Sequence, residues 1–164
     1  MGLIICNKTL SIANLWSPDN WLGLLLRLCL AMFVGGIIGW ERQLRHKPAG
    51  LRTHMLVSLG AALFVLIPLA MSKNENGRDA IERVIQGVAA GVGFLGGGEI
   101  LRECQQEAGK AEVHGLTSAA AIWVSAALGT AAGCGLWQLA LIGALMSLFV
   151  LRVIKEFERR NHRK

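Results

Sequence analysis

The chain has 164 residues, enough for one domain, and 53% of them are hydrophobic while only 17% are charged. A soluble domain carries closer to about a quarter charged residues, so this composition excludes an ordinary water-soluble globular protein. The net charge of +6 could suggest nucleic acid, but the cations lie at the ends of apolar runs, as they do at a cytoplasmic membrane surface. We therefore expect an integral membrane protein with the lipid bilayer as a partner and no nucleic-acid partner.

Residues 1–20 lack the early positive charges and long apolar core of a signal peptide, so they are predicted to form a short outer segment. The first predicted span, Trp21–Trp40, has a tryptophan at each end, where aromatic residues favour the membrane interfaces. At about 1.5 Å per residue the two lie about 28 Å apart, close to the roughly 30 Å of the hydrocarbon core. Arg27 falls inside this span, so it needs an interior polar partner or a path for its side chain to the surface.

The next stretch, from Glu41 to Leu56, reads ERQLRHKPAGLRTHML and joins two apolar runs. It contains one carboxylate, Glu41, and four cations: Arg42, Arg45, Lys47 and Arg52. Because Lys and Arg are enriched in cytoplasmic loops, this connector is predicted to face the cytosol. We expect the working face of the protein to lie there.

Four further segments are apolar and long enough to cross a bilayer. They are Met55–Met71, Val84–Leu101, Leu116–Ala132 and Leu136–Leu151. With the N-terminus outside, twelve Lys and Arg residues lie inside and four outside, which predicts an N-out, C-in topology. The predicted fold is an all-α, polytopic membrane helical bundle of about five helices. It has a transmembrane domain at 21–151 and a basic cytoplasmic tail at 152–164.

Small residues mark two of the spans, and small residues let helices approach closely in lipid. The fourth span carries one small residue every four positions: Thr117, Ala121, Ser125, Gly129 and Gly133. The third span contains Gly93, Gly96, Gly97 and Gly98. Two interpretations of these glycines stay open. They form a tight seam between helices, or they form an unwound helix end whose backbone faces a cavity or ligand.

Two parts of the chain are similar to each other. GGIIGWER (35–42) is followed by AGLRTHMLVSLGAA, and GFLGGGEILR (93–102) is followed by HGLTSAAAIWVSAA. Gly50-Leu51-Arg52-Thr53 thereby aligns with Gly115-Leu116-Thr117-Ser118. A parallel repeat of two hairpins would place Glu41 and Glu99 at equivalent depths near the cytoplasmic face.

These charges suggest a polar site at the cytoplasmic face. Its candidate residues are Glu41, Arg42, Arg52, Thr53, His54, Glu99 and Thr117. A carboxylate bordering hydrocarbon is costly unless it is paired or hydrogen-bonded. The charges therefore pair to lock the bundle, or they line a site for a cation, a proton or a partner protein.

Catalytic and metal-binding patterns are weak. The four histidines show no HExxH spacing, and no Ser/His/Asp or Cys/His set stands out. His54 near Glu41 could bind a metal, but an interfacial structural histidine is the favoured interpretation. The four cysteines show no metal-ligand spacing, and they are free thiols unless Cys6 pairs with Cys134 on the outer side. We expect no enzymatic activity and no cofactor. Whether the protein binds a metal ion stays open.

Three long motifs carry a family resemblance: GGIIGWERQLRHKPAGLRTHMLVSLGAAL, GVAAGVGFLGGGEILR and VHGLTSAAAIWVSAALGTAAGCGLW. In this order and spacing, from about Leu22 to Glu158, the chain resembles the MgtC/SapB family of bacterial inner-membrane proteins. The matching motif residues are Glu41, Arg42, Gly50, Leu51, Arg52, Thr53, Gly93, Phe94, Leu95, Gly96, Gly98, Gly115, Leu116, Thr117 and Trp123. Arg27 also lies where this family tends to have an arginine.

The resemblance implies a multi-pass protein of the bacterial plasma membrane, linked to growth in low magnesium. It also implies action on other membrane machinery rather than carriage of magnesium. Two departures stand out. Glu99 replaces a residue that is usually aliphatic, and the soluble C-terminal domain of many relatives is absent from this sequence.

Two functions follow. The first is a regulator of membrane and ion homeostasis that binds a membrane protein partner through its small-residue faces. The second is a transporter of magnesium, another cation or a small solute. Five helices are few for a monomeric carrier, so the transporter would act as a homodimer.

Overall fold

A computed structural model describes residues 20–71, 77–106 and 115–154 of this chain. These ranges contain α2 (Trp21–Leu44), α3 (Leu51–Met71), α4 (Gly77–Gln106), α5 (Leu116–Gly133), α6 (Trp137–Phe149) and a π-helical turn, η1 (Val150–Ile154). No strand occurs in them, and the predicted all-α helical bundle is confirmed. The predicted outer segment up to residue 19, the tail from residue 155 and the Cys6–Cys134 pairing lie outside the described residues.

Four helices are long and apolar enough to cross a membrane: α2, α3, the Asp79–Leu101 part of α4, and α5. A fifth apolar helix, Trp137–Val153, is shorter and runs through α6 into η1. Large apolar side chains point outward, as the exposed fractions of Phe64 (59%) and Phe94 (83%) show. A surface so rich in apolar groups requires lipid around it. The chain is therefore a helical membrane protein, as its composition predicts.

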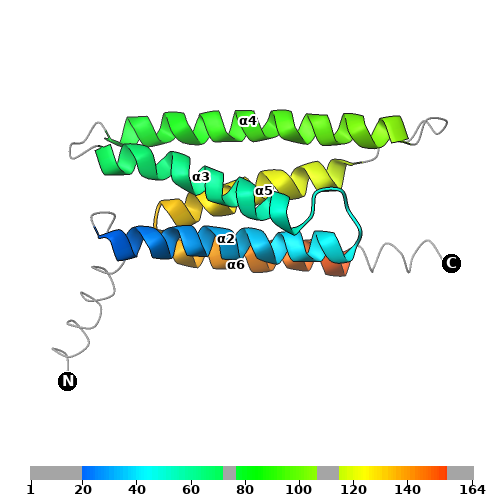
Figure 1. Ribbon diagram of the computed structural model, residues 1–164, viewed down its shortest axis with the longest axis horizontal. Coiled ribbons are helices and arrows are strands. Elements are labelled where there is room, and N and C mark those ends of the chain that lie inside the picture. The colour runs from blue at the N-terminus through cyan, green and yellow to red at the C-terminus, as the bar shows by residue number, and fades with distance from the viewer. Residues whose placement is uncertain (1–19, 72–76, 107–114, 155–164) are drawn as a thin grey trace, which may run out of the picture.

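Consecutive helices run in opposite directions (Figure 1). α2, α4 and α6 end on one side of the bundle, where α3 and α5 begin, and we call this side the connector end. The start of α2 and the end of η1 therefore lie at opposite ends of the bundle, as an odd number of crossings requires. Which end faces the cytosol stays a prediction from the charge distribution.

α5 is the central helix and α4 is the peripheral one. α5 contacts α2, α3, α4 and α6, and 56% of its membrane-spanning window is buried inside the protein. In the membrane-spanning part of α4, only 6% of the residues are buried. Figure 1 shows α4 as an outer rod beside α3 and α5.

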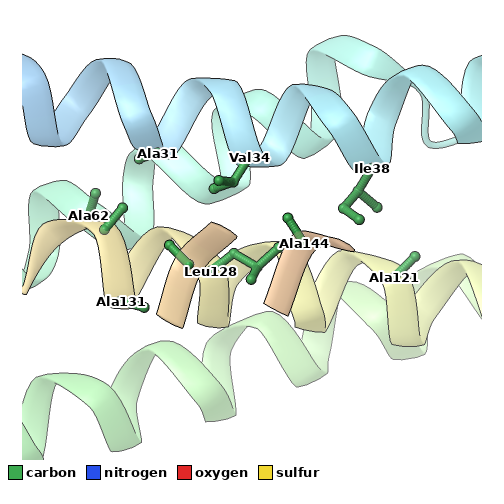
Figure 2. Close-up of a cluster of buried hydrophobic side chains, with 10 residues drawn as sticks. Ala31, Val34, Ile38, Ala62, Ala121, Leu128, Ala131 and Ala144 are labelled. Carbon is green, nitrogen blue, oxygen red and sulfur yellow. The ribbon is translucent and has the colours of Figure 1, made fainter. Parts of the chain in front are cut away.

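The core is built mainly from small side chains. Ten buried residues form one cluster: Ala31, Val34, Ile38, Ala62, Ala121, Leu128, Ala131, Ala132, Ala140 and Ala144. Figure 2 shows Val34 and Ile38 pointing from α2 towards α5. With alanine at most of these positions the helix backbones approach closely, so close packing takes the place of the hydrophobic effect that lipid cannot supply.

Buried glycines make the closest of these approaches. A Cβ added at Gly35 of α2 would lie 2.6 Å from the carbonyl oxygen of His54 in α3. A Cβ at Gly129 of α5 would clash with the backbone of Ser58, and one at Gly133 would lie 2.9 Å from Cα of Ala62. The later part of the predicted small-residue stripe, Ser125, Gly129 and Gly133, therefore lies in the α3–α5 contact.

The glycines of α4 differ from both expectations. α4 is a continuous α-helix through Gly93, Gly96, Gly97 and Gly98, so the structure has no unwound end there. Only Gly96 packs on a neighbour, with its added Cβ 3.3 Å from Cβ of Ala119, whereas the other three face open space. The glycine-rich stretch of α4 stays helical without side-chain contacts, because hydrogen bonds within the helix satisfy its peptide groups.

The two halves of the proposed repeat share their helix starts but not their packing. Leu51 opens α3 and Leu116 opens α5, each directly after a glycine. The glycines before the two loops behave differently, because Gly35 packs against α3 while the aligned Gly93 faces open space. The similarity therefore extends to the helix starts and not to the helix contacts.

Candidate functional site

The C-terminal end of α2 carries a buried carboxylate between two guanidinium groups. Glu41 is 2% exposed and Arg42 is 1% exposed. Oε2 of Glu41 lies 2.5 Å from Nε and from Nη2 of Arg42, and Oε1 accepts a hydrogen bond from Nε of Arg45. We call these three residues the Glu41 cluster. It carries one net positive charge, and like charges repel, so the cluster is a poor site for another cation.

His54 lies in the first turn of α3 and is fully buried against α5. Its Nδ1 is 2.8 Å from Oγ of Ser125. Ser125 also donates to the carbonyl oxygen of Ala121, at 3.0 Å, in the preceding turn of its own helix. A Cβ added at Gly39 of α2 would lie 3.0 Å from Cβ of His54, so His54 packs on the last turns of α2, next to the Glu41 cluster.

Two further serines, Ser58 and Ser118, are buried among the same helices, and Ser58 joins α3 to α2. Ser58, one turn beyond His54 in α3, donates to the carbonyl oxygen of Ala31 in α2 at 2.6 Å. Ser118 of α5 is 1% exposed. The interior of α2, α3 and α5 thus holds several polar groups near the connector end and mainly small or aliphatic side chains beyond it, apart from Arg27. Within residues 20–71, 77–106 and 115–154, no group of three or more His, Cys, Asp or Glu side chains could hold a metal ion.

Arg27 occupies a second polar position, towards the opposite end of the bundle. It is 6% exposed, and Nη1 donates to the carbonyl oxygen of Gly133 at 2.8 Å. Gly133 ends α5, so a cation meets the partly negative end of a helix. Gly135, with φ of 81°, allows the approach, because a Cβ there would lie 2.9 Å from Nη2 of Arg27. The interior partner predicted for Arg27 is therefore the end of α5.

These contacts lie within a stretch that matches a known family. Residues 28–160 match the MgtC family. The chain is 49% identical to protein SrpB of Synechococcus elongatus over 144 residues, which are 85% of this chain and 79% of SrpB. This chain belongs to the MgtC family. The resemblance predicted from the three motifs is confirmed.

Two other relatives extend the comparison. YhiD of Escherichia coli K12, which carries the name of a candidate magnesium transporter, is 42% identical over 137 residues. Protein MgtC of Salmonella typhimurium LT2 is 38% identical over 136 residues. These matches cover 80% and 83% of this MgtC-family chain, but only 60% of YhiD and 54% of MgtC. No solved structure matches the chain.

The structure brings together only part of the site predicted for this MgtC-family chain. Glu41, Arg42 and His54 are buried side by side. Arg52, Thr53 and Thr117 are exposed. Helical phase explains the exposed residues, because successive residues point about 100° apart. Thr53 turns outward beside the buried His54, and Thr117 turns outward beside the buried Ser118.

Glu99 lies apart from the Glu41 cluster, on α4. It is half-buried, and its Oε1 has no hydrogen-bond partner among the described residues. Gly96, one turn before it, is the α4 glycine that packs on α5. Glu99 is therefore on the side of α4 that turns towards the bundle, at the connector end.

Two residues of this MgtC-family site were missed by sequence reasoning. Arg45 is the second cation on Glu41, and its position four residues later is a spacing that signals helical ion pairs. Ser125 was assigned to packing alone because it belongs to the small-residue stripe. Its histidine partner is 71 positions away in the chain, so no local pattern could indicate the bond.

Proposed function

We propose that this protein is a regulator of magnesium and ion homeostasis in the bacterial inner membrane, and that it binds a membrane protein partner through α4. The supporting observation is the exposure of α4. In its membrane-spanning part 6% of the residues are buried, compared with 33% or more in α2, α3 and α5. The face of α4 that turns away from α3 and α5 is free to pack against another membrane helix.

The outward face of α4 suits such a contact. Gly93 and Gly97 are exposed, four residues apart, and have open space around them. This GxxxG spacing lets the backbones of two helices approach closely, and van der Waals contact then drives association. Phe94 beside them is 83% exposed and offers a large apolar contact. The face therefore combines a flat glycine surface with one protruding side chain.

The Glu41 cluster and His54 serve the scaffold in this proposal. The carboxylate is bound to two guanidinium groups, and His54 ties α3 to α5. The bond of His54 to α5 and the bond of Ser58 to α2 join α2, α3 and α5 into one unit that presents α4 to the membrane. Membership of the family that includes Salmonella MgtC supports the link to magnesium.

The test is affinity purification in mild detergent from cells grown in low and in ample magnesium. Gly97→Leu should lower the amount of a reproducible co-purifying membrane protein at least tenfold. Leucine favours a helix over glycine by about 0.8–1 kcal/mol, so α4 itself will not unfold. Ala127→Leu, at an exposed position of α5, is the matched control and should keep the partner. Retention of the partner by Gly97→Leu would contradict the role of α4.

A transporter is the second candidate, and Glu99 is the observation that favours it. A half-buried carboxylate with a free oxygen among the described residues is a plausible cation ligand in a membrane helix. The name of the relative YhiD points the same way. Magnesium flux into liposomes that disappears in Glu99→Gln, but persists in the exposed Glu82→Gln, would favour transport over regulation.

A further inference from the structure

A groove of about 440 Å³ runs along the outer face of α2, between α3 and the α6–η1 helix. Its walls are apolar and include Met32, Phe33, Ile37 and Leu148. Gly36 forms part of its floor, since a Cβ added there would lie 3.6 Å from Cγ of Met55. The missing side chain leaves the groove open to the lipid-facing surface.

The groove ends at the polar edge of the bundle. Trp40 and Arg152 line this end, and both side chains are exposed. Arg152 lies in the π-helical turn η1, a distortion that is frequent at functional sites. No carboxylate pairs with Arg152 in the described part of the chain. A second exposed cation, Arg52, follows directly after Leu51, which also lines the groove.

The dimensions match one leaflet of a bilayer. From Met32 to Trp40 the groove follows α2 for about 12 Å, at about 1.5 Å per residue. The hydrocarbon of one leaflet is roughly 15 Å thick, half of the bilayer core. Trp40 marks the level of the lipid headgroups, because tryptophan concentrates at that interface. An acyl chain in the groove would therefore bring its phosphate to the level of Arg152.

We propose that this groove binds an anionic phospholipid, with an acyl chain along α2 and the phosphate on Arg152. A guanidinium group binds phosphate with two parallel hydrogen bonds, which gives it geometric preference as well as charge. The net positive charge of the Glu41 cluster at the same end of the bundle adds to the attraction. In the N-out topology the lipid belongs to the cytosolic leaflet. The site is independent of the partner surface on α4.

Native mass spectrometry of the purified protein tests the proposal, with phosphatidylglycerol and phosphatidylcholine of the same acyl chains as probes. The wild-type protein should bind phosphatidylglycerol at least fivefold more than phosphatidylcholine. Arg152→Gln should bring this ratio close to one, while Arg83→Gln, which removes an exposed cation from α4, should leave it unchanged. Arg152 is exposed, so the variant will fold.

A second variant tests the contribution of the groove while the charge of Arg152 is kept. Gly36→Leu fills the floor and keeps Arg152, so it should lower the bound phosphatidylglycerol at least threefold, with thermal unfolding as the check on folding. Two results would overturn the proposal. One is wild-type binding of phosphatidylglycerol by Arg152→Gln, and the other is an equal loss in Arg83→Gln, which would indicate non-specific attraction of lipid to a cationic protein.

Discussion

Glu41 lies between two guanidinium groups, and this pairing explains how a carboxylate is tolerated in an apolar bundle. Burying an unpaired ion costs several kcal/mol, of the order of 3–5 kcal/mol when one partner of a buried pair is removed. The side chain of Arg45 is 30% exposed, so the cluster keeps a connection to water at the connector end. All three residues belong to α2 and its C-cap, so these pairs neutralise the carboxylate within one helix end. The net positive charge of the cluster disfavours a cation site.

His54 and Ser125 form the polar link between α3 and α5, and it can be tested by deletion of one hydroxyl. Ser125→Ala leaves the buried Nδ1 of His54 without its hydrogen-bond partner, which should lower the free energy of unfolding by about 1–3 kcal/mol. Ser147→Ala is the matched control. It removes only a bond to the carbonyl of Gly143 in the same helix, so a change within about 0.5 kcal/mol is expected.

Thermal or denaturant unfolding in detergent, followed by circular dichroism, measures both serine variants. Equal stability of Ser125→Ala and Ser147→Ala would show that the bond between the two helices contributes nothing.

The glycines of different helices have different surroundings, and these surroundings indicate whether a helix face is internal or open. On α2 and α5, glycine permits contact between backbones, as Gly35 and Gly129 show. On α4, Gly93 and Gly97 meet no other part of the described chain. The same residue type in similar sequence therefore marks an internal seam in one helix and an open surface in another.

A pair of alanine substitutions tests this contrast. Gly129→Ala places a methyl group into the backbone of Ser58, so α3 and α5 must separate, and overpacking of this kind typically costs about 1–3 kcal/mol. Gly97→Ala has open space around it and improves helix propensity by about 0.8–1 kcal/mol, so stability should stay the same or rise. Unfolding midpoints in the same detergent measure both. A loss in Gly97→Ala equal to that in Gly129→Ala would contradict the open position of α4.

Hydropathy predicts where the helices are, but not where they end. The second span was predicted from Met55, whereas α3 begins at Leu51, because Arg52, Thr53 and His54 are polar and still helical. The third was predicted as Val84–Leu101, whereas α4 runs from Gly77 to Gln106. A helix keeps its backbone hydrogen bonds where it extends beyond the hydrocarbon core, but its residues there are polar. A hydropathy pattern therefore does not include them. The site depends on the face of each helix, so His54 is buried while Thr53 is not.

At the scale of the whole molecule, the bundle has a polar end and an apolar remainder. The Glu41 cluster, His54 and Arg152 all lie towards the connector end, where α2 stops and α3 and α5 begin. Arg27, near the other end, is bound to the end of α5. Since twelve of the cations belong to the connector end or to segments next to it, that end should face the cytosol.

Cysteine labelling in intact cells tests this orientation. In a chain with its four cysteines replaced by serine or alanine, His46→Cys lies in the connector and Asp79→Cys lies at the start of α4, and both positions are exposed. A membrane-impermeant maleimide should label Asp79→Cys in intact cells and His46→Cys only after permeabilisation, because the bundle separates the two positions by the full membrane. The reverse pattern would place the connector outside. It would also move the lipid groove to the outer leaflet and show that the cation distribution does not determine how this protein inserts.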